Sequence, residues 1–366
     1  MVRAWALVLL LSGIVEGLQF QLYGLNYNVR QGPDWDPNRC KTQSQVNADM
    51  QTIATVTSRV RIYSLADCNQ GKMVLSAAKL AGLQVWLGIW VTNDAISLTN
   101  ELDALDNMVT AKLIDSTVIG LHVGSENLYR KDITVDKAIN YYASVKSYLS
   151  LKNFTFPVSI TDVGDVLLQY PRVVQAVDIV MANQFPFWEN ASISMAIGKF
   201  ESKYTSLVGA AQGKEVWIGE TGWASSGTNG NASAATPENQ ATYVANFAAF
   251  AISRQLKYFY FAAFDEDWKI AQEGVADTVE AHFGIFDKTG QLKPKLVGLS
   301  LPPPTSSPPT TVPSSTTTNK TPSTTQRSQS STPSPPTNEP GTSQASTLPH
   351  SVSCLILLCL TVLYFE

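Results

Sequence analysis

Hydrophobic residues between positions 18 and 300 form short runs, and longer segments with apolar residues at helical spacing separate these runs. The short runs predict eight strands, at Leu22–Tyr27, Arg59–Ser64, Gln84–Val91, Val118–Gly124, Phe156–Ile160, Asp178–Asn183, Glu215–Glu220 and Lys257–Phe264. The intervening segments predict helices at Ser44–Val56, Lys72–Ala81, Ala95–Ile114, Thr134–Leu151, Val163–Ala176, Ser192–Val208 and Pro237–Arg254. Pro237 suits a first helical turn, and Thr236 before it suits the N-cap.

This alternation of strands and helices predicts an α/β fold, a single (β/α)8 TIM barrel over residues 18–300. A doubly wound open sheet is the competing fold. Its nucleotide-binding form requires G-x-G-x-x-G after the first strand, and that motif is absent. Because active sites of barrels lie at the carboxyl ends of the strands, we expect functional residues there.

Polar and aromatic residues gather at these predicted strand ends. They include Asn26 and Tyr27, Arg61 and Tyr63, Trp90 and Asn93, Ser125 to Asn127, Asn183 to Trp188, and Asp265 to Lys269. Aromatic faces stack on sugar rings, while amides and carboxylates bind hydroxyl groups. The composition of this rim is therefore typical of a carbohydrate-binding cleft.

Two glutamates stand at the ends of non-adjacent strands. Glu126 follows the fourth strand, and Glu220 ends the seventh between Gly219 and Gly222. Glu220 alone is also consistent with a solvated strand end. Together they would face each other across the barrel mouth, where glycoside hydrolysis needs one protonated and one ionised carboxyl group.

The segments around these acids carry a family resemblance. IGLHVGSENLYR around Glu126 and VWIGETGWASSG around Glu220 resemble the two catalytic motifs of glycoside hydrolase family 17, the β-1,3-glucanases and related glucanosyltransferases. The similarity runs from YGLNYN at Tyr23 to about Lys295 and is greatest to the fungal wall members. Plant members carry Asn at the position of Ser125 and Pro at that of Ala224.

The resemblance implies that Glu126 is the acid/base and Glu220 the nucleophile of a retaining reaction on β-1,3-glucan. It also implies that Glu266 and Lys269 support the site, although a rim ion pair is the alternative. The predicted substrate-binding residues are Tyr27, Arg61, Tyr63, Ser125, Asn183, Phe187, Trp223, Glu266 and Lys269. His122, inside the fourth strand, is more typical of a core histidine.

Three functions remain open on the sequence. An endo-acting β-1,3-glucanase and a β-1,3-glucanosyltransferase would use the same glycosyl-enzyme, with Phe187, Trp188 and Trp223 as candidate acceptor contacts. A wall-anchored glucan-binding glycoprotein without turnover is the third, but the presence of both acids argues against it. Because H-E-x-x-H, a Cys/His cluster and G-x-S-x-G are absent, we expect no metal and no cofactor.

Both ends of the chain are typical of processing signals. Residues 1–17 predict a signal peptide, because Arg3 precedes an apolar run that is shorter than the ~20 residues of a membrane span. Residues 301–341, rich in Ser, Thr and Pro, predict a glycosylated stalk without a core. Residues 342–366 predict a glycosylphosphatidylinositol (GPI) signal with attachment at Gly341 or, as second choice, Ser343; a transmembrane tail is the alternative.

Charge, cysteine content and sequons indicate which partners and which cellular compartment to expect. The formal charge of −4 gives no reason to expect nucleic acid as a partner. In an oxidising compartment Cys40 and Cys68 should form a disulfide, with two free thiols as the alternative. Sequons predict N-glycosylation at Asn153, Asn190, Asn231 and Asn319. We expect a monomer at the cell surface, attached to the plasma membrane or the cell wall.

Overall fold

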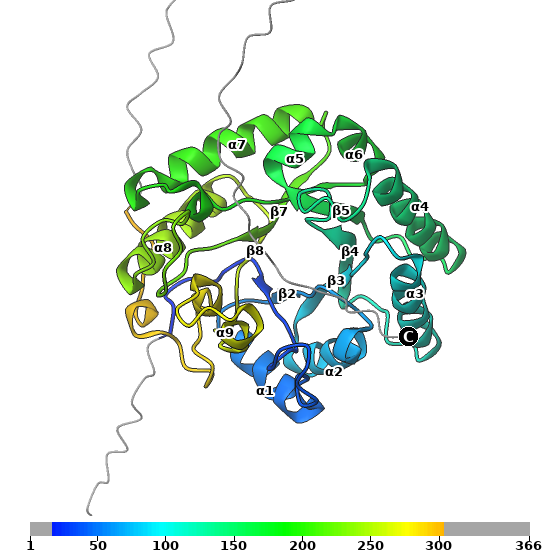
Figure 1. The fold of residues 1–366 in the computed structure, drawn as a ribbon, viewed down its shortest axis with the longest axis horizontal. Coiled ribbons are helices and arrows are strands. Elements are labelled where there is room, and N and C mark those ends of the chain that lie inside the picture. The colour runs from blue at the N-terminus through cyan, green and yellow to red at the C-terminus, as the bar shows by residue number, and fades with distance from the viewer. Residues whose placement is uncertain (1–16, 304–366) are drawn as a thin grey trace, which may run out of the picture. The chain divides into compact units, whose positions relative to one another are not determined.

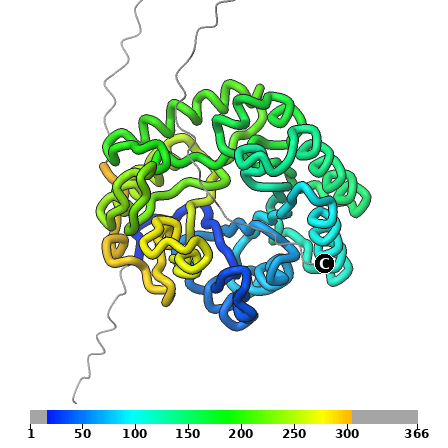
Figure 2. Tube along the Cα trace, in the orientation of Figure 1, coloured from blue at the N-terminus to red at the C-terminus, as the bar shows by residue number. Residues whose placement is uncertain are grey.

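Eight parallel strands form a closed barrel, in chain order, in the computed structural model of the protein. The structure describes residues 17–303. Helices surround the strands on the outside, and the chain traces a closed ring (Figures 1 and 2). The strands are β1 (Leu25–Asn26), β2 (Arg59–Arg61), β3 (Gln84–Ile89), β4 (Val118–Ser125), β5 (Val158–Val163), β6 (Val180–Asn183), β7 (Val216–Thr221) and β8 (Tyr258–Tyr260). The predicted (β/α)8 barrel is confirmed.

Each predicted helix is present, and one of them is divided. The α-helices are α1 (Gln43–Ile53), α2 (Gln70–Ala81), α3 (Ala95–Thr110), α4 (Val135–Leu151), α5 (Gly164–Gln169), α6 (Pro171–Ala176), α7 (Ala196–Ala210), α8 (Pro237–Ser253) and α9 (Trp268–Glu273). Pro171 separates α5 from α6 because it has no N–H to continue the first helix. Thr236 caps α8 by accepting from the Asn239 N–H, as predicted. Short 3-10 helices lie at η1 (Asp67–Asn69), η2 (Pro186–Glu189), η3 (Ile193–Met195), η4 (Val279–His282) and η5 (Pro294–Leu296).

Strand β8 is shorter than the sequence predicts. The expected strand reached Phe264, but the ladder ends at Tyr260. Beyond that point the Ala262 N–H donates to the carbonyl of Phe283, and the Ala263 N–H donates to that of Asn26. The regular strand therefore stops at Tyr260, and α9, which the sequence did not predict, follows.

An aromatic plug fills one end of the barrel interior. Trp86, Trp217 and Phe259 form an apolar cluster separate from the main core, and the two indole rings lie 4.9 Å apart. A Cβ at Gly120 would come within 2.1 Å of the Trp86 ring, so only glycine fits there. The main core lies between the barrel and the helices. The opposite end of the interior is therefore left for the polar side chains.

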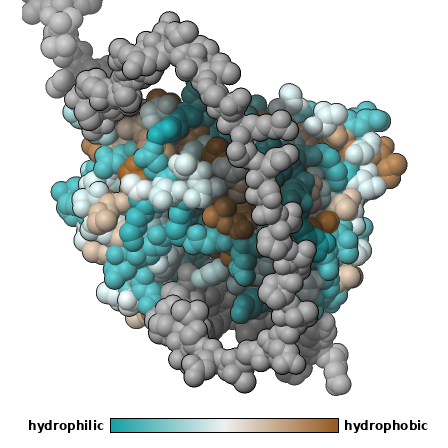
Figure 3. Space-filling model, turned by 90° about the horizontal axis from the view of Figure 1, so that it is seen from above, coloured by the Kyte–Doolittle hydropathy of each residue, from teal (hydrophilic) through white to brown (hydrophobic). Residues whose placement is uncertain are grey.

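The face of the molecule seen in Figure 3 is mostly polar. On the uncovered part of the face in Figure 3, hydrophilic residues dominate and hydrophobic ones form small separate patches. Within the described residues, no helix combines the length and apolar character needed to cross a membrane.

Several expectations about the exterior can be compared with the structure. Cys40 and Cys68 form a disulfide with a Cα–Cα distance of 5.4 Å, which confirms that pairing. The sequon residues Asn153, Asn190 and Asn231 are exposed, so all three are accessible for modification. Residues 1–16 and 304–366 lie outside the described residues. The signal peptide, stalk, GPI site at Gly341 or Ser343 and sequon at Asn319 therefore stay predictions.

Candidate active site

Glu220 reaches the barrel interior through an irregularity in β7. Trp217 packs inside the barrel, so strict alternation along the strand would turn Glu220 toward the helices. The ladder shifts register between Ile218 and Thr221, and also on the β6 side at Asn183. Such a bulge re-aims the side chains that follow it. Glu220 consequently faces the interior, with a side-chain exposure of 10%.

Glu126 stands immediately after β4 in an unusual backbone conformation. Its φ angle is +60°, in the left-handed region that non-glycine residues seldom occupy. The Glu126 N–H donates to the carbonyl of Thr161 at 3.0 Å, which holds this conformation against β5. The carboxylate accepts from Asn183 Nδ2 at 2.9 Å and lies 3.8 Å from Arg130. Both neighbours orient the acid toward the centre of the site.

Ser125 and Asn183 connect the two acids. Asn183 Nδ2 lies 3.3 Å from Ser125 Oγ as well as 2.9 Å from Glu126 Oε1. Ser125 Oγ in turn lies 3.5 Å from Glu220 Oε1. The structure thus brings together two carboxyl groups that are far apart in the sequence. Burial, and then the negative charge of Glu220, raise the pKa of Glu126 to about 7.

A buried arginine accompanies Glu220. The Arg61 side chain is fully buried, and its Nη1 donates to Glu220 Oε1 and to Asn26 Oδ1, each at 2.8 Å. Its Nη2 lies 3.3 Å from Ser125 Oγ. The charged hydrogen bond from the guanidinium group stabilises the negative charge of the carboxylate, and the bonds to Asn26 and Ser125 fix the position of the guanidinium group itself. Arg61 therefore acts on Glu220 rather than facing an open cleft.

His122 lies beside Arg61 in the barrel interior. Its Nε2 is 3.2 Å from Arg61 Nη2. Because a guanidinium only donates, Nε2 must accept, and the ring proton belongs on Nδ1. Burial, and then the charge of Arg61, hold the pKa of His122 well below its usual value. His122 is a neutral core histidine, as its position in the strand indicated.

A lysine lies between two acids in the segment that follows β8. Lys269 on α9 is 9% exposed and lies 2.9 Å from Glu266 and 3.3 Å from Glu280. Sequence reasoning identified the first two residues but missed Glu280. The only signal for Glu280 was its place two residues before HFGIFD, a segment that carries the family resemblance. Because Lys269 is almost fully buried, this cluster is not the exposed ion pair at the rim that was the alternative.

The predicted sugar-binding residues divide into two groups. Tyr63 belongs with the acids, because its buried hydroxyl has no hydrogen-bond partner within residues 17–303 and because burial, and then the charge of Glu220, raise its pKa. Tyr27, Phe187 and Trp223 are instead buried among other side chains of the protein. The Tyr27 hydroxyl donates to Asp49 at 2.6 Å. Phe187 and Trp223 are completely buried, with ring centroids 5.3 Å apart.

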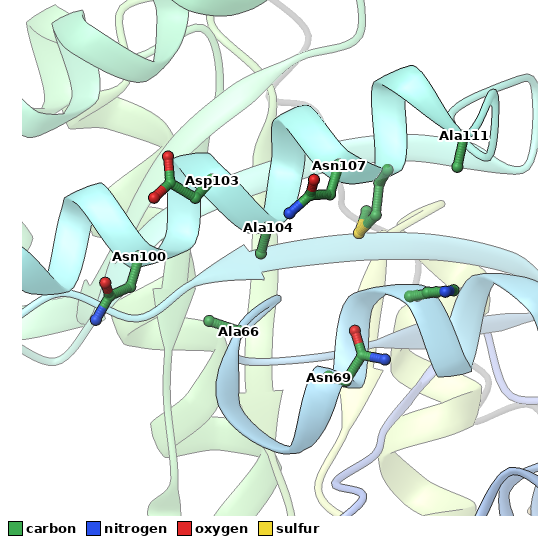
Figure 4. Close-up of a pocket in the computed structure, with 9 residues that line it drawn as sticks. Ala66, Asn69, Asn100, Asp103, Ala104, Asn107 and Ala111 are labelled. Carbon is green, nitrogen blue, oxygen red and sulfur yellow. The ribbon is translucent and has the colours of Figure 1, made fainter.

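One surface pocket lies away from these acids. It has a volume of about 310 Å³ and lies between α2 and α3 (Figure 4). Asn100, Asp103 and Asn107 extend from α3 on one side, and Asn69 faces them from the other. Neither Glu126 nor Glu220 lines it. Within residues 17–303, no group of three or more His, Cys, Asp or Glu side chains could hold a metal ion.

Comparison with known proteins decides the family. Residues 24–284 match the family described as the BtgE/BtgC glycoside hydrolase domain. This chain belongs to that family. The matched range contains the whole barrel and both acids, so the resemblance to glycoside hydrolase family 17 is confirmed.

Two curated relatives resemble this BtgE/BtgC-type domain. The "Probable glucan endo-1,3-beta-glucosidase btgC" of Aspergillus fumigatus is 30% identical over 71% of this chain. The "Glucan 1,3-beta-glucosidase" of Saccharomyces cerevisiae is 30% identical over 69% of this chain. The matches span 40% of the length of the Aspergillus protein and 85% of that of the yeast protein.

Solved structures also resemble the barrel. An active-site mutant of Rhizomucor miehei β-1,3-glucanosyltransferase in complex with laminaritriose is 34% identical, with a TM-score of 0.67, and the match covers 76% of this chain and 97% of that one. An endo-laminarinase from Formosa Hel1_33_131 is 19% identical, with a TM-score of 0.59, over 75% of this chain and 84% of that one. The second likeness concerns the fold alone.

Proposed function

We propose that this protein is a retaining glycoside hydrolase that cleaves β-1,3-glucan within the chain. The observation that carries the proposal is the pairing of two carboxyl groups in different surroundings. Glu126 has a pKa of about 7, whereas Glu220 lies against the buried Arg61 guanidinium. A glycosidase needs this division between a proton donor and a charged nucleophile.

The reaction follows from this arrangement in two steps. Glu220 attacks the anomeric carbon while Glu126 gives its proton to the departing glycosidic oxygen, which leaves a covalent glycosyl-enzyme. Glu126, now ionised, then removes a proton from the incoming acceptor, which displaces Glu220 and restores the initial configuration. The pKa of about 7 suits both roles of Glu126 near neutral pH.

The names of the relatives support the choice of glucan. Both curated relatives are named as glucosidases of 1,3-linked glucan, and the Rhizomucor protein was solved with laminaritriose. That neighbour is a β-1,3-glucanosyltransferase, which favours transfer as the second candidate activity. In transfer, a sugar hydroxyl replaces water as the acceptor of the same intermediate.

Incubation with laminaripentaose tests the activity. The expected result is shorter products with retained anomeric configuration by NMR; products longer than the pentaose would indicate transfer. Glu126→Gln and Glu220→Gln should each lower kcat by about 10³-fold or more. The control Glu201→Gln changes a partly exposed acid on α7 that pairs with Arg254 and not with the residues of the site, so its kcat should match wild type. Full activity of Glu220→Gln would refute the assignment.

For the whole chain we propose display at the outer cell surface as a secreted monomer held by a GPI lipid. The disulfide and three exposed sequons support passage through an oxidising, glycosylating compartment. A phosphatidylinositol-specific phospholipase C should release the protein from intact cells. Retention after that treatment, with release by glucan digestion, would indicate attachment to the wall.

A further inference from the structure

Trp35 is an exposed indole on the loop between β1 and α1. Its exposure is 66%, and it is the only aromatic residue among the strongly exposed large hydrophobic side chains of residues 17–303. An indole left in water forgoes the stabilisation that burial would provide. The aromatic residues of the core show that this fold buries such rings elsewhere, so the position of Trp35 calls for a function.

Ion pairs and a disulfide anchor the loop that carries Trp35. Arg30 pairs with Asp34, next to Trp35, and its Nε lies 2.7 Å from Asp67 on η1. The Cys40–Cys68 disulfide joins the same two segments. These bonds hold the indole on a preorganised support, so a ligand would bind it with little loss of loop entropy.

Two hydrogen bonds connect the loop to α9, next to the acid–lysine cluster. The Asp34 N–H donates to Gln272 Oε1 at 2.9 Å, and Gln272 Nε2 donates to Asp34 Oδ2 at 3.2 Å. Gln272 lies on α9, one helical turn after Lys269 of the acid–lysine cluster. The segments that support Trp35 thus follow the carboxyl ends of β1, β2 and β8, which is the end of the barrel at which Glu126 and Glu220 stand.

We propose that Trp35 is the stacking platform of a distal glucan-binding subsite. This inference rests on the proposed function, because it extends the same cleft to glucosyl units away from the cleaved bond. The C–H face of a glucosyl ring would cover the indole, while the flanking Asp34 and Asp36 could accept hydrogen bonds from its hydroxyls. Only oligosaccharides long enough to reach the β1–α1 loop would gain from this contact.

The test compares laminari-oligosaccharides of two to seven units with the full chain and its Trp35→Ala variant. The expected result is unchanged kcat/KM for the shortest cleaved substrate and a drop of about tenfold for the longest, equivalent to about 1.4 kcal/mol. Trp35→Phe should restore part of the loss. Leu151→Ala, at an 80%-exposed apolar position on the amino-terminal side of the strands, should match wild type.

Binding to the Glu220→Gln protein gives a readout without turnover. There, adding Trp35→Ala should weaken the affinity for laminariheptaose about tenfold and leave that for laminaribiose unchanged. Equal behaviour of Trp35→Ala and wild type at every length would overturn the subsite, as would an equal loss at every length. If wild type neither binds nor cleaves any of these glucans, the proposed function itself fails and the subsite falls with it.

Discussion

Replacing Arg61 with Met is the most informative change to the folded protein. The methionine side chain occupies similar space but cannot form the ion pair with Glu220. It also removes the donors to Asn26 and Ser125. Since Glu220 has a side-chain exposure of only 10%, the variant would leave a charged group in the interior without its partner.

The size of the effect follows from the geometry. Two unit charges about 4 Å apart interact by about 4 kcal/mol at an effective dielectric constant near 20. Breaking a buried pair by removing one partner costs about 3–5 kcal/mol in measured cases. We therefore expect Arg61→Met to lower the free energy of unfolding by about 3–5 kcal/mol in urea denaturation at neutral pH.

A double-mutant cycle separates the charge from packing. In Arg61→Met/Glu220→Gln no buried charge is left unpaired, so the double variant should be less destabilised than Arg61→Met alone. Arg61→Lys keeps the charge but loses the planar fork and should fall between wild type and Arg61→Met. A wild-type stability for Arg61→Met, or strictly additive effects in the cycle, would show that the ion pair contributes nothing.

The proposed acid role of Glu126 predicts that kcat/KM falls as pH rises through about 7, because above its raised pKa the carboxyl group has no proton to donate. A fall centred near pH 4.5 would contradict this. Replacing Cys40 and Cys68 with Ala, 28 positions apart, should destabilise the fold by about 3.6 kcal/mol on the chain-entropy relation. An unchanged urea midpoint would contradict that value. Burial raises the pKa of Glu101 from 4.5 to about 7, so the contribution of this group to stability is greatest below pH 4.5 and is lost as pH rises through about 7. Glu101→Gln should flatten this part of the stability–pH profile, and an unaltered profile would exclude Glu101 as its source.

The barrel and its candidate catalytic acids could be predicted from the sequence. The alternating strand and helix patterns depend on residues close together in the chain, so they can be recognised without knowledge of distant contacts. Glu126 and Glu220 stood at strand ends, and the closed parallel topology brings such ends to one edge. The pairing of Cys40 with Cys68 was predicted because these are the two cysteines outside the predicted C-terminal signal.

Tertiary packing decided which side chains face the site. Strict alternation would have turned Glu220 away, and only the register shift beside β6 and β8 turns it inward. Phe187 and Trp223 had the composition of sugar-binding residues, yet they pack against each other in the interior. The sequence by itself determined the barrel and the strand ends at which its acids stand. Only the tertiary structure decided three further features: the ion pair of Glu220 with Arg61, the approach of Glu280 to Lys269, and the exposure of Trp35. Each depends on residues distant in the chain, because burial and charge pairing arise only when those segments meet.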